Sequence, residues 1–369
     1  MNLNFQNNSS NKTEKFMKFL IAVLIVTAFS LGGYIWTKKG GLQTASLLEN
    51  SLISRFTGDA EEKLSPDLKL ARITSEDSRF AVLSEDGKNV IYYVPSSGEI
   101  KSVPINGSGN SINVAVVDKL AENITWSKNR KELILTRNSR SKYFNLSSGL
   151  AKELPVNALY PAFSQFENRI SYVSFNNEEG SGHINVADPK IEGFKELVPT
   201  RSSYWLSGWV KESIVYLHKP DLRYYELSTV YTLDIQTGKL APIVELDKHL
   251  SFEWSPTGNK ILYSSEDPGD GKLKLHVNEL LSGNISNLDL ETSASKCSWG
   301  NNEETIYCSK PGPGGDTFYM VTLSSKDGPQ KIITPDENTD ATELVLTSSG
   351  DYLIFRNLNN NRLYSLLLK

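Results

Sequence analysis

The sequence predicts an all-β fold: a seven-bladed β-propeller with four-stranded antiparallel blades, preceded by one transmembrane helix. Three observations lead to this prediction: a motif that recurs seven times, a strand left over on each side of the repeats, and an uncharged run of nineteen residues near the N-terminus. The chain has 369 residues, of which 39% are hydrophobic and 22% charged, which suits one large all-β domain. The predicted segments are a cytoplasmic tail at 1–15, a transmembrane helix at 16–37, a stalk at 38–67 and a propeller at 68–369.

The transmembrane helix is predicted from the uncharged run between Phe19 and Thr37. A helix of this length spans a hydrocarbon core of ~30 Å. Tyr34 and Trp36 lie where an aromatic belt is expected, and lysines flank the run on both sides. We therefore expect a single-pass protein of the cytoplasmic (inner) membrane, with its N-terminus inside and its propeller outside. A cleaved signal peptide is the alternative, although Tyr34-Ile35-Trp36 makes a poor cleavage site.

The charge of the chain is unevenly distributed. Residues 1–39 carry five lysines and the single acid Glu14, so the net charge of −4 for the whole chain leaves −8 on the remainder. Phosphate binding needs clustered cations, and this acidic body has none. Nucleic acid is therefore not an expected partner.

The stalk has apolar residues at roughly helical spacing, namely Leu42, Ala45, Leu48, Leu52 and Phe56. This pattern indicates a helix that lies on a surface or associates with itself. A spacer without specificity is the alternative.

The propeller is predicted from a repeat of an aromatic residue or leucine, a polar turn and an apolar triplet. The clearest copy runs from Phe252 to Tyr263, and the triplets of the seven copies end at residues 92, 135, 172, 216, 263, 308 and 355. Each interval has room for two more strands, as at Lys274–Leu280 and Phe318–Leu323. Four strands in roughly 40 to 50 residues are typical of a propeller blade.

The two ends of the repeat region predict how the ring closes. After the last triplet the chain has one more strand, Arg362–Leu368, which leaves the last blade one strand short. An extra strand, Leu68–Thr74, precedes the first copy. Because a closed sheet hides the edges that an open one exposes, we expect this strand to complete the last blade.

Ser255-Pro256-Thr257-Gly258 after Trp254, and Ser84-Glu85-Asp86-Gly87 after Leu83, resemble the W-S-P-D-G turn of TolB-type propeller repeats, a WD-repeat-like family. The resemblance covers roughly residues 68–369. It implies a propeller whose relatives mostly act as protein-binding platforms in the cell envelope. The anchor and stalk of this chain stand where TolB has an additional domain.

The sequence contains none of the common linear motifs of catalysis or nucleotide binding. Its histidines lie in different repeats without metal-ligand spacing, at positions 183, 218, 249 and 276. We therefore expect no enzyme activity, no metal and no cofactor. Propellers also build sites around their central channel, where the first strands of the blades offer only Glu253 and Lys296.

Cys297 and Cys308 flank the hairpin of the sixth repeat. They align with Phe252 and Tyr263 of the fifth repeat, so we expect them to face each other across adjacent strands. An oxidising compartment would permit a disulfide, whereas two free buried thiols are the alternative.

Five repeats begin with a large aromatic residue: Trp126, Phe163, Trp209, Trp254 and Trp299. Their regular recurrence indicates packing between blades. A set of rings that stack on a ligand is the alternative.

One rim of the ring is predicted to bind a ligand. Turns between the second and third strands share a face with the connections between blades, and there the middle repeats carry Tyr160, Tyr204, Trp205, His218, Arg223, Tyr224, Tyr225 and His249. Exposed aromatic rings beside arginine and histidine are typical of binding surfaces. The alternative is that these rings only cover blade edges.

Acidic residues gather on the same rim, at Glu178, Glu179, Glu266, Asp267, Asp270 and Asp316. The turn Asp267–Gly271 lacks the full ligand set of a calcium loop, so we expect a solvated acidic turn.

These observations predict a membrane-tethered module that binds a protein or peptide of the cell envelope. A propeller that binds a glycan or the cell wall is the first alternative, and a hydrolase or lyase with its site in the central channel is the second.

Overall fold

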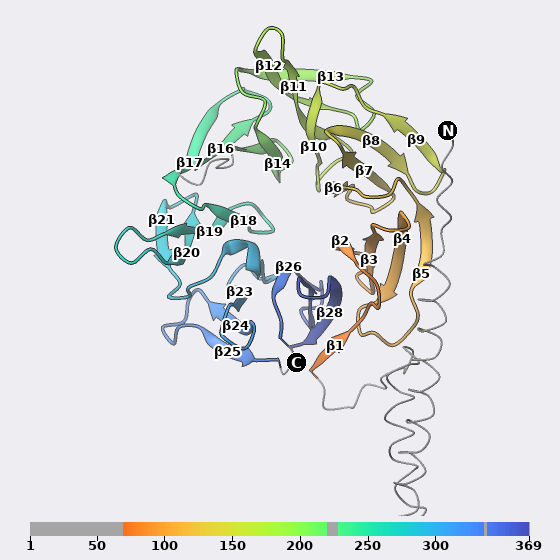
Figure 1. Cartoon of the computed structure of the whole chain (residues 1–369). Coiled ribbons are helices and arrows are strands. Elements are labelled where there is room, and N and C mark those ends of the chain that lie inside the picture. The colour runs from red at the N-terminus through yellow and green to blue at the C-terminus, as the bar shows by residue number, and fades with distance from the viewer. Residues whose placement is uncertain (1–68, 220–227, 336–337, 369) are drawn as a thin grey trace, which may run out of the picture. The chain divides into compact units, whose positions relative to one another are not determined.

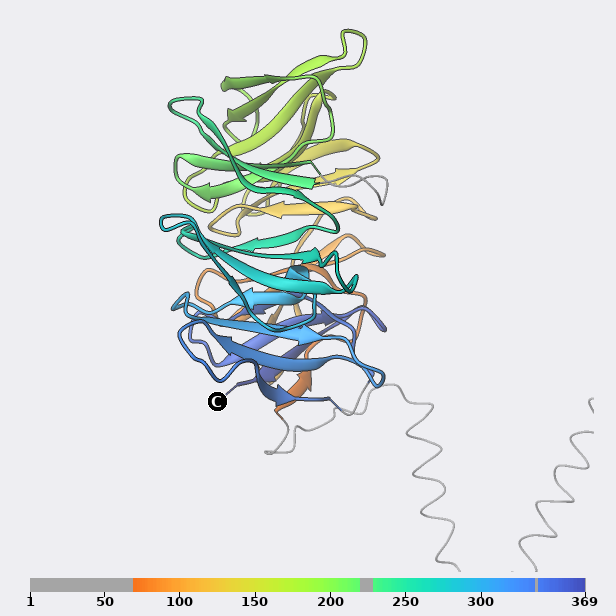
Figure 2. The ribbon, with the colours of Figure 1, turned by 90° about the vertical axis from the view of Figure 1, so that its left-hand side faces the viewer.

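The computed structural model describes residues 69–219, 228–335 and 338–368, and these residues form seven antiparallel sheets of four strands each. The sheets are arranged as blades around a central axis (Figure 1), and Figure 2 shows the ring from its edge. The seven-bladed propeller predicted from the repeats is confirmed. The predicted tail, transmembrane helix and stalk lie outside the described residues.

In blades 1 to 6 the four strands follow the chain from the innermost to the outermost position. Blade 7 has the same order in its first three strands, but its outermost strand, Leu70–Arg72, comes from the N-terminal side of the propeller. Blade 1 contains β2 (Arg79–Leu83), β3 (Asn89–Val94), β4 (Glu99–Pro104) and β5 (Ile112–Val116). Blade 2 contains β6 (Asn123–Trp126), β7 (Glu132–Arg137), β8 (Arg140–Asn145) and β9 (Leu150–Glu153). Blade 3 contains β10 (Ala158–Phe163), β11 (Ile170–Asn176), β12 (Ser181–Ala187) and β13 (Phe194–Thr200). Blade 4 contains β14 (Leu206–Lys211), β15 (Ile214–Lys219), β16 (Ser228–Asp234) and β17 (Leu240–Asp247).

The remaining blades repeat this plan. Blade 5 contains β18 (Ser251–Trp254), β19 (Lys260–Glu266), β20 (Leu273–Glu279) and β21 (Asn284–Asn287). Blade 6 contains β22 (Cys297–Trp299), β23 (Thr305–Lys310), β24 (Thr317–Thr322) and β25 (Gln330–Ile333). Blade 7 contains β26 (Ala341–Leu346), β27 (Tyr352–Asn357), β28 (Arg362–Leu367) and β1 (Leu70–Arg72).

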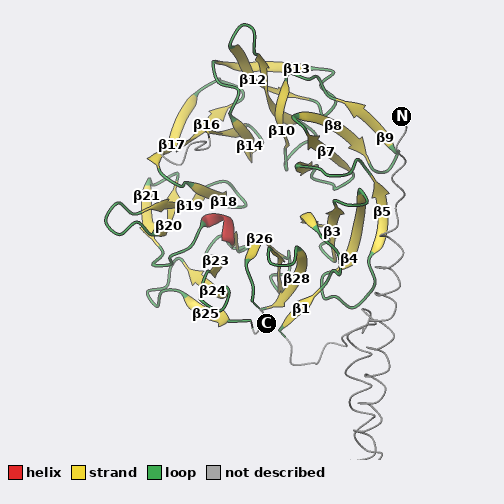
Figure 3. Cartoon of the chain, viewed as in Figure 1, coloured by secondary structure: helices red, strands yellow, loops and turns green. Residues whose placement is uncertain are grey.

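The only helix of the described residues is a short 3₁₀ helix, η1 (Ala294–Lys296), which stands out in Figure 3. In the part of the chain that the structure describes, no helix has the length and apolar character needed to span a membrane.

The apolar triplets of the repeat form the second strands, which are covered by neighbours on both faces. In β3, for example, five of six residues are buried. In blades 1, 2, 5 and 7 the polar turn before the second strand is closed by a hydroxyl: for example, Ser84 Oγ accepts from the Asn89 N–H at 3.0 Å, and Ser255 Oγ from the Lys260 N–H at 3.1 Å. The same serine-containing turn therefore ends the first strand and starts the second.

The ring is closed by β1, as the two ends of the repeat region predict. β1 pairs antiparallel with β28, with Leu70 opposite Leu366. Beyond the strand, the Ile73 N–H donates to the Leu363 carbonyl at 2.9 Å, and Thr74 Oγ1 accepts from the Leu363 N–H at 2.9 Å. Both termini of the propeller therefore belong to one sheet, and blade 7 is complete.

Adjacent blades are joined through the aromatic residues that begin the repeats. The Trp126 indole N–H donates to the Phe80 carbonyl of the preceding blade at 3.0 Å, and Trp299 donates to the Glu253 carbonyl at 3.1 Å. Trp209 donates to the Ala162 carbonyl in the same way, at 3.2 Å. The prediction that these rings pack between blades is confirmed, since each belongs to a cluster of apolar residues.

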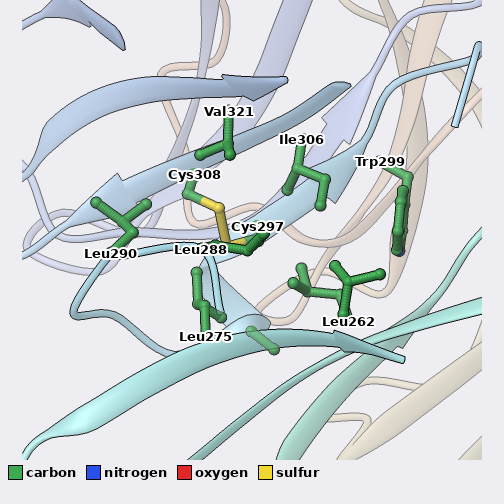
Figure 4. Packing of buried hydrophobic residues seen from close by; sticks show 11 residues of the cluster. Leu262, Leu275, Leu288, Leu290, Cys297, Trp299, Ile306, Cys308 and Val321 are labelled. Carbon is green, nitrogen blue, oxygen red and sulfur yellow. A yellow bond between two sulfur atoms is a disulfide. The ribbon is translucent and has the colours of Figure 1, made fainter. Parts of the chain in front are cut away.

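Cys297 and Cys308 lie opposite each other on β22 and β23 and form a disulfide. The bond is buried between blades 5 and 6, where Leu275 and Leu288 surround it (Figure 4). The register that brings the two residues together is the one that their alignment with Phe252 and Tyr263 predicts.

Closure of the ring can be tested at Ile73, a buried side chain directly after β1. Ile73→Ala removes apolar contacts between the closing strand and blade 1, and we expect the free energy of unfolding to fall by about 2–5 kcal/mol. Urea denaturation measures this change. The exposed neighbour Arg72 is the control, since Arg72→Ala leaves the core intact. Equal effects of the two substitutions would contradict the role of Ile73 in closure.

The tryptophan bonds between blades can be tested by comparing two residues at the same place in the repeat. Trp126 has its carbonyl partner, whereas the buried Trp254 indole N–H has no acceptor among the described residues. Both Trp→Phe changes remove similar volume, but only Trp126→Phe breaks a hydrogen bond. We expect Trp126→Phe to destabilise the protein by about 1 kcal/mol more than Trp254→Phe in urea denaturation. The opposite order would show that the indole bond does not stabilise the ring.

Candidate functional site

A cavity of about 760 Å³ lies near the centre of the ring, between the innermost strands of the blades. Its walls come from the first strands of blades 1, 2, 3, 4, 5 and 7, from the turns that follow two of them, and from Tyr216 on the second strand of blade 4. Arg130 and Glu253 are the only charged residues among the described residues that line it. Aromatic rings and small polar groups make up much of the remaining wall, including Trp126, Tyr160, Tyr216, Thr125, Gln165 and Ser207.

Arg130 is held rigidly in the turn after β6. Its Nε donates to the Leu83 carbonyl at 3.2 Å, and its Nη1 donates to the Ser127 carbonyl and to Gln165 Oε1, both at 2.9 Å. Gln165 is fixed in turn, since its Nε2 donates to the Trp126 carbonyl at 3.0 Å. The guanidinium therefore bridges blades 1, 2 and 3, and burial lowers its pKa.

Arg130 occupies a backbone position that glycine fills in other blades. The corresponding residues of blades 1, 5 and 7 are Gly87, Gly258 and Gly350, with φ of 68°, 67° and 73°. Arg130 adopts φ of 59° with the same turn hydrogen bond, from its N–H to the Ser127 carbonyl at 3.1 Å. A side chain here strains the backbone, so blade 2 carries an arginine where the local geometry favours glycine.

Glu253 lies in the wall formed by β18. Its side chain is exposed to the channel, but the surrounding atoms of the ring limit its hydration, and this raises the pKa of the carboxyl to about 7. Among the described residues the carboxyl has neither a hydrogen-bond donor nor a cation as a partner. Glu253 is therefore available to a ligand.

Tyr216 reaches the cavity from the second strand of blade 4 because Gly208 leaves room for it. A Cβ atom on Gly208 would lie only 2.5 Å from the Tyr216 ring. The ring also stacks on Trp254, with centroids 6.2 Å apart. Burial, with Glu253 as a second cause, raises the pKa of the Tyr216 hydroxyl to about 12, so the hydroxyl keeps its proton.

Tyr160 enters the cavity from a bulge in β10. The register of β10 against β11 shifts between Leu159 and Ala162, and Tyr160 has φ of 50°. Tyr160 as a whole residue remains 41% exposed while lining the cavity. Of the rim residues predicted from the sequence and described in the structure, Tyr160 is the one that lines the cavity.

Two other predicted rim residues lie outside the cavity, on the connection between blades 3 and 4. Tyr204 is 51% exposed. Trp205 is more covered, since its indole N–H donates to Thr200 Oγ1 at 3.0 Å and its ring packs edge-on against Tyr231. Tyr204 thus offers a free surface, whereas Trp205 mainly covers the edge of blade 4.

The prediction that His218 contributes to an exposed rim is wrong. His218 is buried, and its ring packs edge-on against Phe252 of the next blade, with centroids 5.1 Å apart. Burial lowers the pKa of His218 to about 4, so the imidazole is neutral at physiological pH. The burial of His218 could not be predicted from the composition of the loop, because the composition does not show that the end of β15 faces blade 5.

The other predicted rim residues are distributed differently. His249 Nε2 lies 3.2 Å from Glu266 Oε2, an ion pair when the imidazole is protonated. Arg223, Tyr224 and Tyr225 lie outside the described residues.

Several residues of the predicted acidic rim form ion pairs within the ring, one of them with Lys296. Asp267 and Asp270 both pair with Lys274, at 2.6 and 3.5 Å. Lys296 Nζ donates to Asp316 at 2.8 Å and to Asp340 at 2.6 Å, linking blades 6 and 7. Lys296, considered a channel group from its sequence position, instead stabilises the ring.

Sequence reasoning missed Arg130, Gln165 and Tyr216. Two signals were present: Arg130 replaces the glycine of the repeated turn, and Gly208 interrupts the first strand of blade 4 before Trp209. Neither signal says that the two positions share a cavity.

Solved structures share the fold. An oligogalacturonate lyase in complex with manganese aligns with a TM-score of 0.63 and 10% identity over 81% of this chain and 93% of the lyase. The oligogalacturonate lyase of Vibrio parahaemolyticus aligns with a TM-score of 0.61, with the same identity and coverage. TolB from Acinetobacter baumannii has a TM-score of 0.45 and 10% identity, over 87% of this chain and 68% of TolB. At these identities the likeness to the lyases shows the fold alone. No protein-family model and no curated protein matches the chain.

The unusual pKa of Glu253 predicts a pH dependence of stability. In the folded state the carboxyl holds its proton up to about pH 7, whereas the ordinary pKa of a glutamate carboxyl is 4.5. Between these values the folded state binds more protons than the unfolded state, so stability decreases as the pH rises. We expect the wild type to lose stability relative to Glu253→Gln across this interval, as measured by urea denaturation at stepped pH. Parallel profiles for the two proteins would show that Glu253 titrates normally.

Proposed function

We propose that this protein is a non-enzymatic binding module, tethered to the cytoplasmic membrane with its propeller outside, which captures a protein or peptide segment in the central cavity. The observation that carries this proposal is the central cavity itself. Its volume of about 760 Å³ is within the range of ligand pockets, and its two charged groups, Arg130 and Glu253, have no ionic partner among the described residues. In the described part of the chain the guanidinium has no counter-ion and the poorly hydrated carboxyl has no hydrogen-bond partner, which supports a ligand that pairs with both.

The extracytoplasmic location is supported by the bond between Cys297 and Cys308. Structural disulfides persist in oxidising compartments and are rare in the cytosol. The uncharged run at residues 19–37, with lysines on both sides, supports a membrane tether.

A binding role is supported by how the titratable groups of the cavity are placed. General bases and nucleophiles are oriented by hydrogen bonds to a neighbouring group, and the Glu253 carboxyl receives none from the described residues. The Arg130 guanidinium, in contrast, is held in one orientation by three hydrogen bonds, as is typical of a group that recognises a ligand.

A lyase or glycan-binding role is the second candidate. It is favoured by the pKa of about 7 at Glu253, which suits a general base, with the protonated Tyr216 hydroxyl near it. Two structurally similar proteins are oligogalacturonate lyases. Release of an unsaturated product from oligogalacturonate by the purified protein, and its loss in Glu253→Gln, would replace the binding proposal.

The proposed function can be tested by crosslinking in whole cells. A photoreactive residue in place of Tyr160 lies in the cavity, whereas one in place of Tyr204 lies outside it and serves as the control. After irradiation we expect position 160 to join a defined peptide of one envelope protein, identified by mass spectrometry, and position 204 to give no such product.

The same pair of positions gives a quantitative test with the captured peptide. Because stacking on Tyr160 is lost, Tyr160→Ala should weaken binding about tenfold or more, while Tyr204→Ala leaves it unchanged. Crosslinks from position 160 to cell-wall glycan, or to nothing, would contradict the proposal.

A further inference from the structure

Arg130 provides the positive charge in the wall of the cavity. Three hydrogen bonds use its Nε and Nη1, but its Nη2 donates to none of the described residues. The Nη2 atom is not fully buried, so it remains accessible. An immobilised guanidinium with free N–H groups matches the planar geometry of a carboxylate.

The same turn position in blade 6 provides a comparison for Arg130. Glu303 occupies the same turn position, with φ of 55°, and there the side chain has a structural partner, because Glu303 Oε2 accepts from Thr257 Oγ1 at 2.8 Å. Arg130 has the same strained backbone and its side chain is likewise hydrogen-bonded to neighbouring residues, but its Nη2 donates to none of the described residues. The strained turn of blade 2 thus carries an N–H group that is available to a ligand, and strained backbone positions cluster at functional sites.

The remaining wall adds a group of the opposite kind. Glu253 on blade 5 is also unpaired, and its carboxyl accepts hydrogen bonds or a positive charge from a ligand. The cavity thus has one anion-binding group and one acceptor, with the aromatic rings of Tyr160 and Tyr216 also in its wall. A ligand with one carboxylate and several N–H groups fits this arrangement.

We propose that the cavity binds the free carboxyl-terminal end of a peptide, with the Arg130 guanidinium holding the terminal carboxylate and Glu253 accepting from the N–H groups of the peptide. This inference rests on the proposed function and names the part of the partner that enters the ring. Gln165 is a positioning residue, because it holds the Arg130 guanidinium by a hydrogen bond and does not itself bind the carboxylate of the peptide.

An acidic oligosaccharide fits the same walls less well. Each uronate adds a carboxylate, and the cavity offers a single cation among its described residues. Glu253, when ionised, repels further negative charge. A peptide end has one carboxylate, and its backbone supplies N–H donors.

The experiment uses the full-length protein in detergent and a set of tetrapeptides made both as free acids and as carboxyl-terminal amides. Isothermal titration calorimetry measures the dissociation constants at pH 7.5. We expect free acids to bind, and their amides to bind about tenfold or more weakly, because the amide loses a charged hydrogen-bonded pair. Glu253→Gln should weaken both forms without removing the preference for the acid.

Arg130→Gly is the decisive variant, since its backbone position favours glycine. We expect it to abolish the preference for the acid, whereas the matched control Glu303→Gly keeps it. Thermal denaturation of both variants reports whether the ring is folded. If Arg130→Gly does not fold, the comparison of acid and amide on the wild type still decides the inference.

Three results would overturn the inference. Equal binding of acids and amides would reject the terminal carboxylate and leave peptide capture in place. Binding of neither form would reject this inference, and crosslinking from position 160 would then decide the proposed function separately. Tighter binding of digalacturonate than of any tetrapeptide would assign the cavity to an acidic sugar.

Discussion

Pairing of β1 with β28 is the constraint on which the rest of the structure depends. A ring of sheets is stable only when every blade is covered by its neighbours, and blade 7 would lack its outer strand without residues 70–72. The bonds of Ile73 and Thr74 to Leu363 continue this junction into the connection to blade 1. Closure therefore joins chain segments almost three hundred residues apart, and blades 1 and 7 on either side of this junction both line the cavity.

The blades that line the cavity contribute different parts of its wall, because their first strands differ in sequence. In blades 2, 4 and 6 the tryptophan of the first strand binds the carbonyl of the preceding blade. At blade 5 this bond is absent among the described residues, and Trp254 packs on Tyr216 instead. Gly208 makes that packing possible, and the same arrangement places the Tyr216 ring in the channel wall. A local loss of hydrogen bonding thus accompanies the formation of the candidate site.

At Arg130, too, a residue of the candidate site is less favourable for stability than the alternative, which here is glycine. Glycine would be the less strained residue at φ of 59°, as in three other blades. The arginine recovers part of this cost through its bonds to blades 1 and 3, but its charge remains without an ionic partner among the described residues. Sites that bind ligands often keep such strained and unpaired groups, because the ligand completes them.

The sequence by itself determined the number of blades, the strand pairs and the closing strand. It also determined the register that places Cys297 opposite Cys308 and the packing of the repeated tryptophans between blades. These features follow from local periodicity, because a repeated turn and an apolar triplet specify one strand pair each time they occur. Only the tertiary structure decided that Arg130, Tyr160, Tyr216 and Glu253 share one cavity, and that His218 is buried. Their side chains come from four blades and meet through the curvature of the ring, and no spacing along the chain encodes that meeting.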